Sequence, residues 1–179
     1  MQTKEAFNQL VVELSPIFSS QEIAAITVQL YPPEFNGSFG YVDEITRQAA
    51  ILADLIVTCN NVYLSNAFDN RTYAYLFAVP QAFHGQDVPY TYYNGIDQVQ
   101  GNIGPQTIAV NVAHAMQEIL TTFAATGRPT YGTGMTIAQW GMTSNMLTLN
   151  TTGFAEGPDS AASPRCRFWQ SVQSQLDPN

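Results

Sequence analysis

The residues Thr72 to Pro89, TYAYLFAVPQAFHGQDVP, decide which fold this sequence predicts. The first eight of them, Thr72 to Val79, are β-branched, aromatic or aliphatic side chains without charge. Such a run is typical of a strand that is buried on both faces in the middle of a parallel sheet. Pro80 ends the strand, because proline has no N–H to donate to a neighbouring strand. We therefore expect an α/β fold.

A short loop with a histidine, His84, follows the predicted strand. Open α/β sheets place their chemistry on the loops that follow the carboxyl ends of their strands. This position makes His84 a candidate catalytic residue. A loop histidine that hydrogen-bonds its own backbone is the alternative interpretation, and the position alone does not separate the two.

The composition excludes several classes of protein. With 179 residues and 45% apolar side chains, the chain is large enough for one domain with a sizeable core. Fourteen acidic residues against six basic ones give a net charge of −8, so a nucleic-acid-binding basic stripe is not expected. The longest apolar run, 49–58, is broken by Asp54 and is too short to span a membrane. Two histidines and two cysteines offer little for a metal site, and no glycine-rich phosphate loop suggests a cofactor.

Three N-glycosylation sequons suit a secreted protein, and they begin at Asn36, Asn70 and Asn150. A disulfide between the two cysteines would agree with secretion. The first residues, MQTKEAF, contain no apolar run of the kind that a signal peptide needs. A secreted character without a signal peptide is expected of a piece that lacks its N-terminus.

The residues before the strand predict helices. Apolar residues at helical spacing predict an amphipathic helix over residues 3–14. Ser19 and Glu22 have the spacing of a capping box at the start of a second helix. A third helix is expected to begin near Asp43 and to run, with a kink, to Phe68. Its expected apolar face consists of Ile45, Ala49, Leu52, Ile56 and Cys59.

After the strand, fewer residues show a regular period. Residues 89–104 are rich in Tyr, Asn, Gly and Gln, and we expect a loop. Pro105 suits the first turn of a helix that Gly127 closes as a left-handed cap. Residues 146–149 predict a short edge strand and residues 163–175 a last helix. The apolar stripe of the helix before Gly127 consists of Ile108, Val112, Met116, Ile119, Leu120 and Phe123.

Seven pieces of the sequence follow one another between about Phe7 and Val172. They are LYP at 30–32, the helix that reaches Cys59, the strand at 73–77, FHGQD at 83–87, FAATGRP at 123–129, Trp140, and CRFW at 166–169. In this order they resemble the type B carboxylesterases, the cholinesterase and lipase family of α/β-hydrolases. The resemblance implies a partial α/β-hydrolase fold, with residues 1–179 as a single C-terminal segment of a carboxylesterase type B domain.

The same resemblance implies an activity and site residues. The full-length reaction would be the hydrolysis of small-molecule carboxylic esters through an acyl-serine, without a cofactor. His84 would be the general base that takes the serine proton and returns it to the leaving alcohol. Cys59 and Cys166 would be joined by a disulfide.

The serine nucleophile of the family, which lies in Gly-x-Ser-x-Gly between a strand and a helix, has no counterpart in the sequence. The nearest string is NGSFG at 36–40, in which the first glycine is replaced and no strand is predicted before it. Its serine, Ser38, also completes a sequon. The oxyanion-hole segment is absent as well, and by the resemblance the triad acid would precede Met1. The chain alone is therefore expected to be inactive.

Three other polar residues have local interpretations. Asp87 is too close to His84 in sequence to bond the far ring nitrogen, and we expect a local role in which it either satisfies loop N–H groups or caps the following turn. Asp54 lies in a nearly apolar helical segment and is expected to be a partly buried hydrogen-bonding acid. His114 is expected on a solvated helix face, paired with Glu118.

Two alternatives to a segment of an ester hydrolase stay open. The first is a non-catalytic interaction protein of the same fold that has lost the serine, and the residues upstream of Met1 would distinguish it. The second is a self-sufficient hydrolase that uses Ser38, which mutation of that serine would test.

Overall fold

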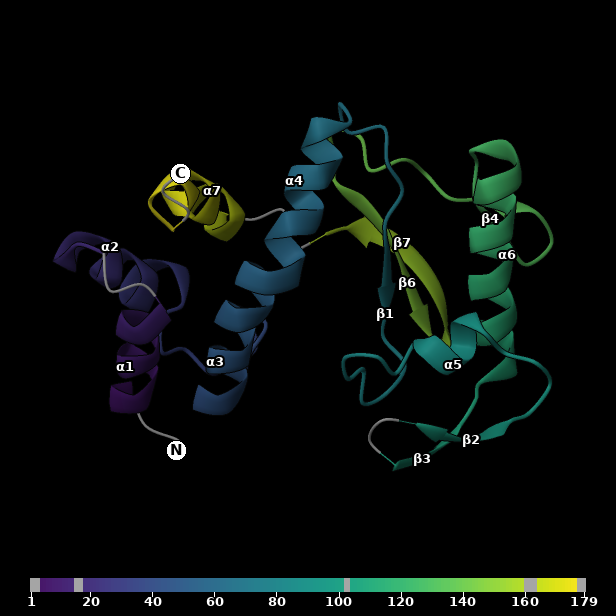
Figure 1. Cartoon of the computed structure of the whole chain (residues 1–179), viewed down its shortest axis with the longest axis horizontal. Helices are drawn as coiled ribbons and strands as arrows, with labels where there is room; N and C mark the ends of the chain where they lie inside the picture. The colour runs from purple at the N-terminus through teal and green to yellow at the C-terminus, as the bar shows by residue number, and fades with distance from the viewer. Residues whose placement is uncertain (1–3, 15–17, 102–103, 160–163, 177–179) are drawn as a thin grey trace. The chain divides into compact units, whose positions relative to one another are not determined.

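The computed structural model describes residues 4–14, 18–101, 104–159 and 164–176. The chain divides into two compact units. We call Met1–Ala67 with Ser160–Asn179 the helical unit, and Phe68–Asp159 the sheet unit. Every strand of the described ranges lies in the sheet unit (Figure 1). No helix of the described residues is long and apolar enough to cross a membrane.

The first helices of the helical unit form where the sequence predicts them. Helix α1 spans Lys4–Leu14, and helix α2 (Ser20–Ala24) continues directly into a π-helix, η1 (Ala25–Leu30). The predicted capping box is present, because the Ser19 side chain accepts from the Glu22 N–H and the Glu22 carboxylate accepts from the Ser19 N–H. The two reciprocal bonds satisfy donors that a helix start leaves open.

The third predicted helix extends through α3 (Glu44–Ala53), a π-helix η2 (Asp54–Thr58) and α4 (Cys59–Ala67). Asp43 caps its start by accepting a 2.7 Å bond from the Thr46 N–H. The predicted apolar face is wrong in its main part, because Ile45 is 49% and Ile56 67% exposed. The helix carries apolar residues on more than one side. The buried side is the one whose polar residues, Arg47 and Asp54, form hydrogen bonds with the rest of the helical unit. That buried side consists of Arg47, Ile51, Asp54, Cys59, Val62 and Ser65.

The last helix, α7 (Pro164–Leu176), begins at Pro164 as expected. A disulfide joins its Cys166 to Cys59 at the start of α4, the pair that the family resemblance implies. The Tyr63 hydroxyl donates a 2.8 Å bond to the Cys166 carbonyl. Both cysteines are buried, so the contact between α4 and α7 is fixed covalently and by packing.

The sheet unit contains a three-stranded sheet in the order β1-β6-β7. Strand β1 (Tyr75–Phe77) pairs in parallel with β6 (Asn145–Asn150), which pairs antiparallel with β7 (Gly153–Pro158). The parallel pairing was expected, but the positions were not. The strand expected in the middle, β1, lies at the edge of this sheet, and the strand expected at the edge, β6, lies in the middle.

Burial follows the positions of these strands. Leu147 and Leu149 of β6 are fully buried, whereas Leu76 of β1 is 46% exposed. The prediction of a strand buried on both faces is therefore wrong within the described residues. Among the described residues, strand β1 has a hydrogen-bonded neighbour on one side only, and an edge position leaves its apolar side chains partly exposed to solvent.

Helix α6 (Val110–Thr126) packs against the sheet (Figure 1). Gly127 closes it with φ of +71°, the left-handed conformation that glycine adopts without a Cβ penalty. Leu120 and Phe123, two members of the predicted stripe, are 40% and 51% exposed. The core beside the sheet includes Tyr90, Ile108, Val112, Met116, Ile119, Leu147 and Leu149.

The stretch predicted as a loop contains regular structure. Helix α5 (Val88–Thr91) comes first, and then β2 (Gln98–Gly101) and β3 (Gly104–Thr107) form an antiparallel pair. Pro105 lies in β3 opposite Gln100 and not in the first turn of a helix. A two-stranded ribbon tolerates proline, because each strand has a free edge. Two further short strands, β4 (Thr130–Tyr131) and β5 (Met135–Thr136), form an antiparallel pair after α6.

Candidate active site

His84 lies on the loop between β1 and α5, just after the carboxyl end of a parallel strand. The Ala78 N–H still donates to the Leu149 carbonyl at 2.8 Å, and Val79 is buried. The chain leaves the sheet at Pro80. Such a loop is where open α/β sheets present reactive side chains.

The loop is folded tightly on itself. The Ala82 N–H donates to the Val79 carbonyl at 2.7 Å, and the Val88 N–H donates to the Gly85 carbonyl at 3.3 Å. Gly85, directly after His84, has φ of +82°, a backbone conformation that a larger residue adopts only with strain. This sharp reversal presents the residue before it at the tip of the loop.

The imidazole of His84 is exposed at this tip. Within the part of the chain that the structure describes, no residue hydrogen-bonds it, so the alternative of a histidine tied to its own backbone does not apply there. The ring nitrogens are thus accessible to a group from outside the loop.

Gln86 holds the loop from inside. Its side chain is 6% exposed. Its amide nitrogen donates to the Pro80 carbonyl at 3.1 Å, and its amide oxygen accepts from the Phe83 N–H at 3.1 Å. The Gln86 N–H also donates to the Phe83 carbonyl at 3.0 Å. Sequence analysis missed this residue, because a lone glutamine in a loop carries no motif.

Asp87 has a local role, as expected, but through its backbone. Its carbonyl accepts from the N–H groups of Tyr90 and Thr91, and its side chain makes no capping bond to α5. Burial first, and then the charge of Asp87, raise the pKa of the Tyr75 phenol on β1. The described residues show no hydrogen bond between the Asp87 carboxylate and His84.

Ser38 lies in the helical unit, on the loop between η1 and α3. Its hydroxyl donates to the Asn36 side-chain oxygen at 2.6 Å, and its N–H donates to the same oxygen at 2.9 Å. A π-helix and not a strand precedes this loop. The strand–turn–helix geometry that activates a serine in Gly-x-Ser-x-Gly is therefore absent around Ser38.

Asp54 is buried and hydrogen-bonded, as predicted. The Tyr31 hydroxyl donates to it at 2.7 Å, and Arg165 lies 3.6 Å from the same carboxylate oxygen. The Trp169 indole N–H donates to the Tyr31 hydroxyl at 2.9 Å. Burial, followed by the Asp54 charge, raises the pKa of Tyr31 well above its ordinary range. This network connects Tyr31, at the end of η1, with η2 and α7.

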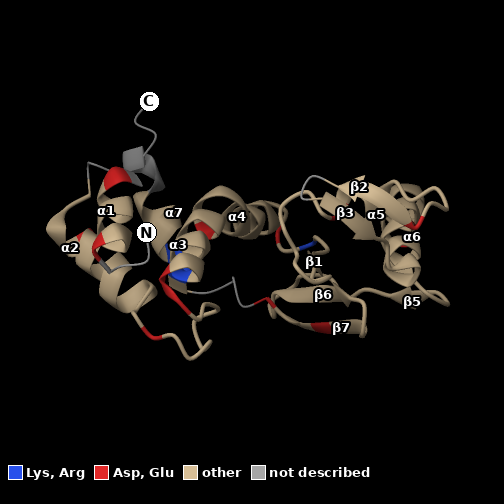
Figure 2. Ribbon diagram, turned by 90° about the horizontal axis from the view of Figure 1, so that it is seen from below, with Lys and Arg blue, Asp and Glu red and all other residues tan. Residues whose placement is uncertain are grey.

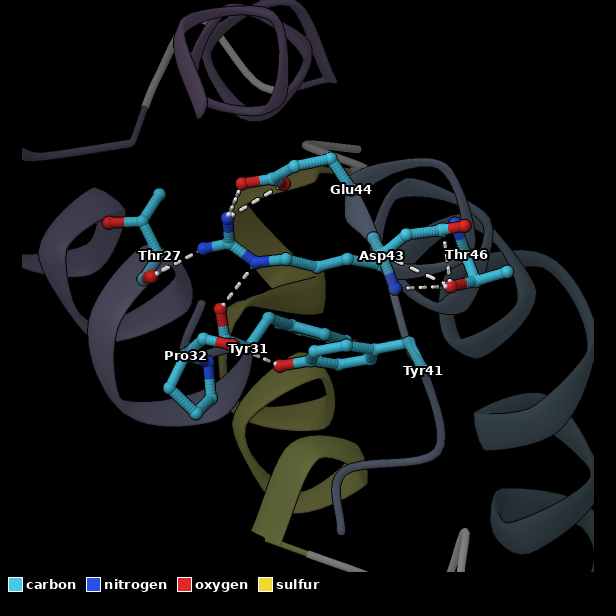
Figure 3. Close-up of polar contacts among 8 residues, drawn as sticks. Thr27, Tyr31, Pro32, Tyr41, Asp43, Glu44 and Thr46 are labelled. Carbon is cyan, nitrogen blue, oxygen red and sulfur yellow. Dashed lines mark hydrogen bonds and ion pairs between the residues drawn. The ribbon is translucent and has the colours of Figure 1, made fainter. Parts of the chain in front are cut away.

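Arg47 is a buried cation that sequence analysis did not single out. Its guanidinium donates to the carbonyls of Tyr31 and Thr27 at 2.8 Å each and forms a 3.0 Å ion pair with Glu44 (Figure 3). It also lies 3.6 Å from the centre of the Phe7 ring. Acidic residues outnumber basic ones in the chain, and the ribbon in Figure 2 is coloured by this charge. Arg47 and Glu44 are an oppositely charged pair within the helical unit.

His114 lies exposed on α6, as predicted, but with a different neighbour. Its ring contacts Tyr93 edge-on, with 5.7 Å between the ring centres. Glu118, its predicted partner, accepts a 3.3 Å bond from the Thr130 hydroxyl. Tyr93 could not be anticipated, because it lies in the stretch predicted as a loop.

The three sequons lie at turns. Asn36 is exposed, Asn70 has a left-handed φ of +59° after α4, and Asn150 ends β6 before the turn into β7. No group of three or more His, Cys, Asp or Glu side chains that could hold a metal ion occurs in the described ranges.

Comparisons with known sequences find relatives of one kind. No protein-family model matches the chain. The chain is 32% identical over 143 residues to the carboxylesterase patB of Aspergillus clavatus and 31% identical over 144 residues to that of Penicillium expansum. Each alignment covers 80% of this chain, but 24% and 25% of the relatives. The chain thus spans about a quarter of the length of the curated relatives that it matches.

Among solved structures, the chain is similar to the crystal structure of Aspergillus niger EstA, with a TM-score of 0.72 and 16% identity. The match covers 97% of this chain and 36% of EstA. The fold is therefore part of an α/β-hydrolase fold. Together with the two sequence relatives, it shows that the chain is related to the type B carboxylesterases and corresponds to part of such a protein.

Proposed function

We propose that this chain supplies the histidine loop of a serine-type carboxylesterase. In this proposal His84 is the general base that takes the proton of a serine hydroxyl and then gives it to the leaving alcohol. The observation that carries it is an exposed imidazole without a hydrogen-bonding partner in the described residues, held after the carboxyl end of a parallel strand. The names of the sequence relatives support carboxylic esters as substrates.

The remaining catalytic groups come from outside these residues in our proposal. Ester hydrolysis needs a nucleophile, a base in contact with it and donors for the oxyanion. Only the base is identifiable in this sequence, since Ser38 lies on a loop without the required geometry. The reaction as proposed needs no cofactor, because the serine oxygen replaces the alcohol at the acyl carbon and water then replaces the serine, while the histidine moves the protons.

We also propose that the protein is secreted and glycosylated. A disulfide and three sequons at turns support this. Glycopeptide mass spectrometry of protein made in a eukaryotic secretory host would detect glycans on Asn36, Asn70 or Asn150, and three unmodified sequons would contradict the proposal.

A chimeric enzyme tests the proposed role of His84. In it, residues of this chain replace the matching 143-residue segment of the Aspergillus clavatus carboxylesterase. The His84→Ala variant should lose on the order of 10³-fold or more of kcat on a short-chain aryl ester. His114→Ala is the matched control and should hydrolyse the ester at nearly the parent rate, because its ring faces solvent and Tyr93.

Three results would contradict the proposal. Full activity of the His84→Ala chimera would exclude His84 as the general base. A folded parent chimera that does not hydrolyse esters would favour a non-catalytic interaction role for this segment. Ester hydrolysis by residues 1–179 alone that Ser38→Ala abolishes would instead favour a self-sufficient hydrolase.

A further inference from the structure

We propose that Gln86 is the positioning residue of the catalytic loop. This inference rests on the proposed role of His84 as general base. The carboxamide of Gln86 lies inside the loop whose tip carries His84, and it bonds to the backbone on the incoming side of that histidine. Both of its bonds go to main-chain groups and not to the imidazole, so it would act by fixing the backbone from which the ring projects.

The chemistry of the side chain matches the two backbone groups. The Pro80 carbonyl needs a donor and the Phe83 N–H needs an acceptor, and a single carboxamide offers both. A third bond runs from the Gln86 main-chain N–H to the Phe83 carbonyl, so Gln86 and Phe83 are joined twice. The carboxamide thus holds the peptide unit between Ala82 and Phe83, one residue before the proposed base, and the Gln86 N–H holds the peptide unit that joins Phe83 to His84.

The rest of the loop offers few substitutes for these bonds. The Ala82–Val79 and Val88–Gly85 backbone bonds close the two ends of the loop. In the described residues, no side chain forms a hydrogen bond with His84 or Gly85 that would hold the tip of the loop. Because a displacement of about 1 Å of a catalytic group costs on the order of 10²-fold in rate, the loss of the carboxamide should act on kcat.

The first test replaces the carboxamide by an apolar side chain of similar length. In the chimeric enzyme, Gln86→Met should lower kcat on the order of 10²-fold, with KM within about two-fold, because a residue that only positions the base acts on the chemical step and not on substrate binding. Gln81→Met is the matched control, since Gln81 is an exposed glutamine of the same loop, and it should keep the parent kcat. Active sites are titrated with a phosphonylating reagent and rates are expressed per active site. A smaller fraction of folded enzyme then does not lower the measured kcat.

The second test uses a side chain whose protonation state decides whether it forms one or both of the hydrogen bonds to Pro80 and Phe83. In the Gln86→Glu variant, a protonated carboxyl can donate to the Pro80 carbonyl and accept from the Phe83 N–H, whereas the carboxylate can only accept. Burial favours the protonated form. The ratio of variant to parent kcat should therefore be highest near pH 5 and should fall as the pH rises through the pKa of that carboxyl. A purely structural loss would give a ratio that is independent of pH.

Each outcome decides between the hypotheses. If His84→Ala abolishes hydrolysis while Gln86→Met and Gln81→Met have equal kcat, the inference about Gln86 is wrong and the proposed function stands. If His84→Ala is fully active, the proposed function is wrong, and the inference about Gln86 is wrong with it. Should the chimera not fold, hydrogen exchange of the peptide spanning 78–88 in the 179-residue chain replaces the assay. Faster exchange of the Phe83 amide in Gln86→Met than in Gln81→Met supports the inference, and equal exchange overturns it.

Discussion

At the scale of single residues, the helical unit depends on a cation that has no contact with solvent. Arg47 is fully buried and donates to the carbonyls of Tyr31 and Thr27 as well as to the Glu44 carboxylate. Burying a charge is unfavourable unless it is paired and hydrogen-bonded, and here every nitrogen of the guanidinium has an acceptor. The guanidinium therefore connects η1 to α3.

Replacing this arginine should destabilise the unit strongly. Arg47→Met keeps the length of the side chain but leaves two carbonyls and the Glu44 carboxylate without their donor. We expect the free energy of unfolding to fall by about 3 to 5 kcal/mol, measured by urea denaturation followed by circular dichroism. Arg71→Met is the control and should change it by less than about 1 kcal/mol, because the Arg71–Asp69 pair is exposed. Equal losses for the two variants would show that Arg47 is not a structural centre.

At the scale of elements, the start of α3 shows how one carboxylate makes helix stability depend on pH. The Thr46 main-chain N–H, followed by the Thr46 hydroxyl, lowers the pKa of Asp43 below its ordinary value. A group whose folded-state pKa is lowered stabilises the fold above its unfolded pKa, and this contribution disappears as the pH falls through the folded pKa.

The variant Asp43→Ala should therefore be less stable than the parent at pH 7, and the difference should shrink below about pH 4. Thermal unfolding at pH 7 and pH 2.5 measures both differences. Asp69→Asn serves as the control, since Asp69 lies on an exposed turn with a left-handed φ that asparagine also adopts, and it should show little change at either pH. A difference for Asp43→Ala that stays constant with pH would mean that the carboxylate does not act as a charged cap.

The elements that could be predicted from the sequence are those with local causes. The capping box at Ser19 and Glu22 and the glycine cap at Gly127 were recognised because each acts within a few residues of its own helix. Strand β7 was missed, because GFAEGP has neither apolar alternation nor β-branched residues and exists through its pairing with β6. Pairing partners lie far along the chain and leave no local period.

The choice of buried face failed for a related reason. Ile45 and Ile56 are more apolar than Arg47 and Asp54, so periodicity alone favours the wrong side of the helix. The polar side is buried because residues of other elements satisfy its charges. The carbonyls of Tyr31 and Thr27 accept from Arg47, and the Tyr31 hydroxyl, which itself accepts from Trp169, donates to Asp54. At the site, the His84 loop followed from a strand and a family motif, whereas Gln86 emerged only from the folded loop.

At the scale of the whole molecule, apolar side chains remain exposed in both units. Ile56 and Leu64 on the long helix are 67% and 56% exposed, and Leu76 on the edge strand is 46% exposed. Exposed apolar groups and an open strand edge favour association. The chain also matches only about a quarter of its carboxylesterase relatives, which agrees with surfaces that are covered in a longer protein.

We therefore expect the 179-residue chain, made alone, to bind a hydrophobic dye and to self-associate. The double variant Ile56→Gln and Leu64→Gln should bind less dye and sediment as a smaller species. Ile51→Gln is the control, since Ile51 is fully buried, and it should unfold the unit and increase dye binding. A parent chain that is a monodisperse monomer with a cooperative melt and no dye binding would refute this expectation.

The Cys59–Cys166 disulfide has a further consequence for the order of events during synthesis. The helical unit is discontinuous in sequence, with the whole of Phe68–Asp159 between its two parts. At roughly 5 to 20 residues per second, the ribosome needs on the order of ten seconds to make that intervening stretch. During this time Cys59 carries a free thiol, and Tyr31 and Asp54 lack Trp169 and Arg165. The sheet unit is complete before the helical unit can be, so a premature stop after Asp159 would spare the histidine loop and leave the helices without their final partner.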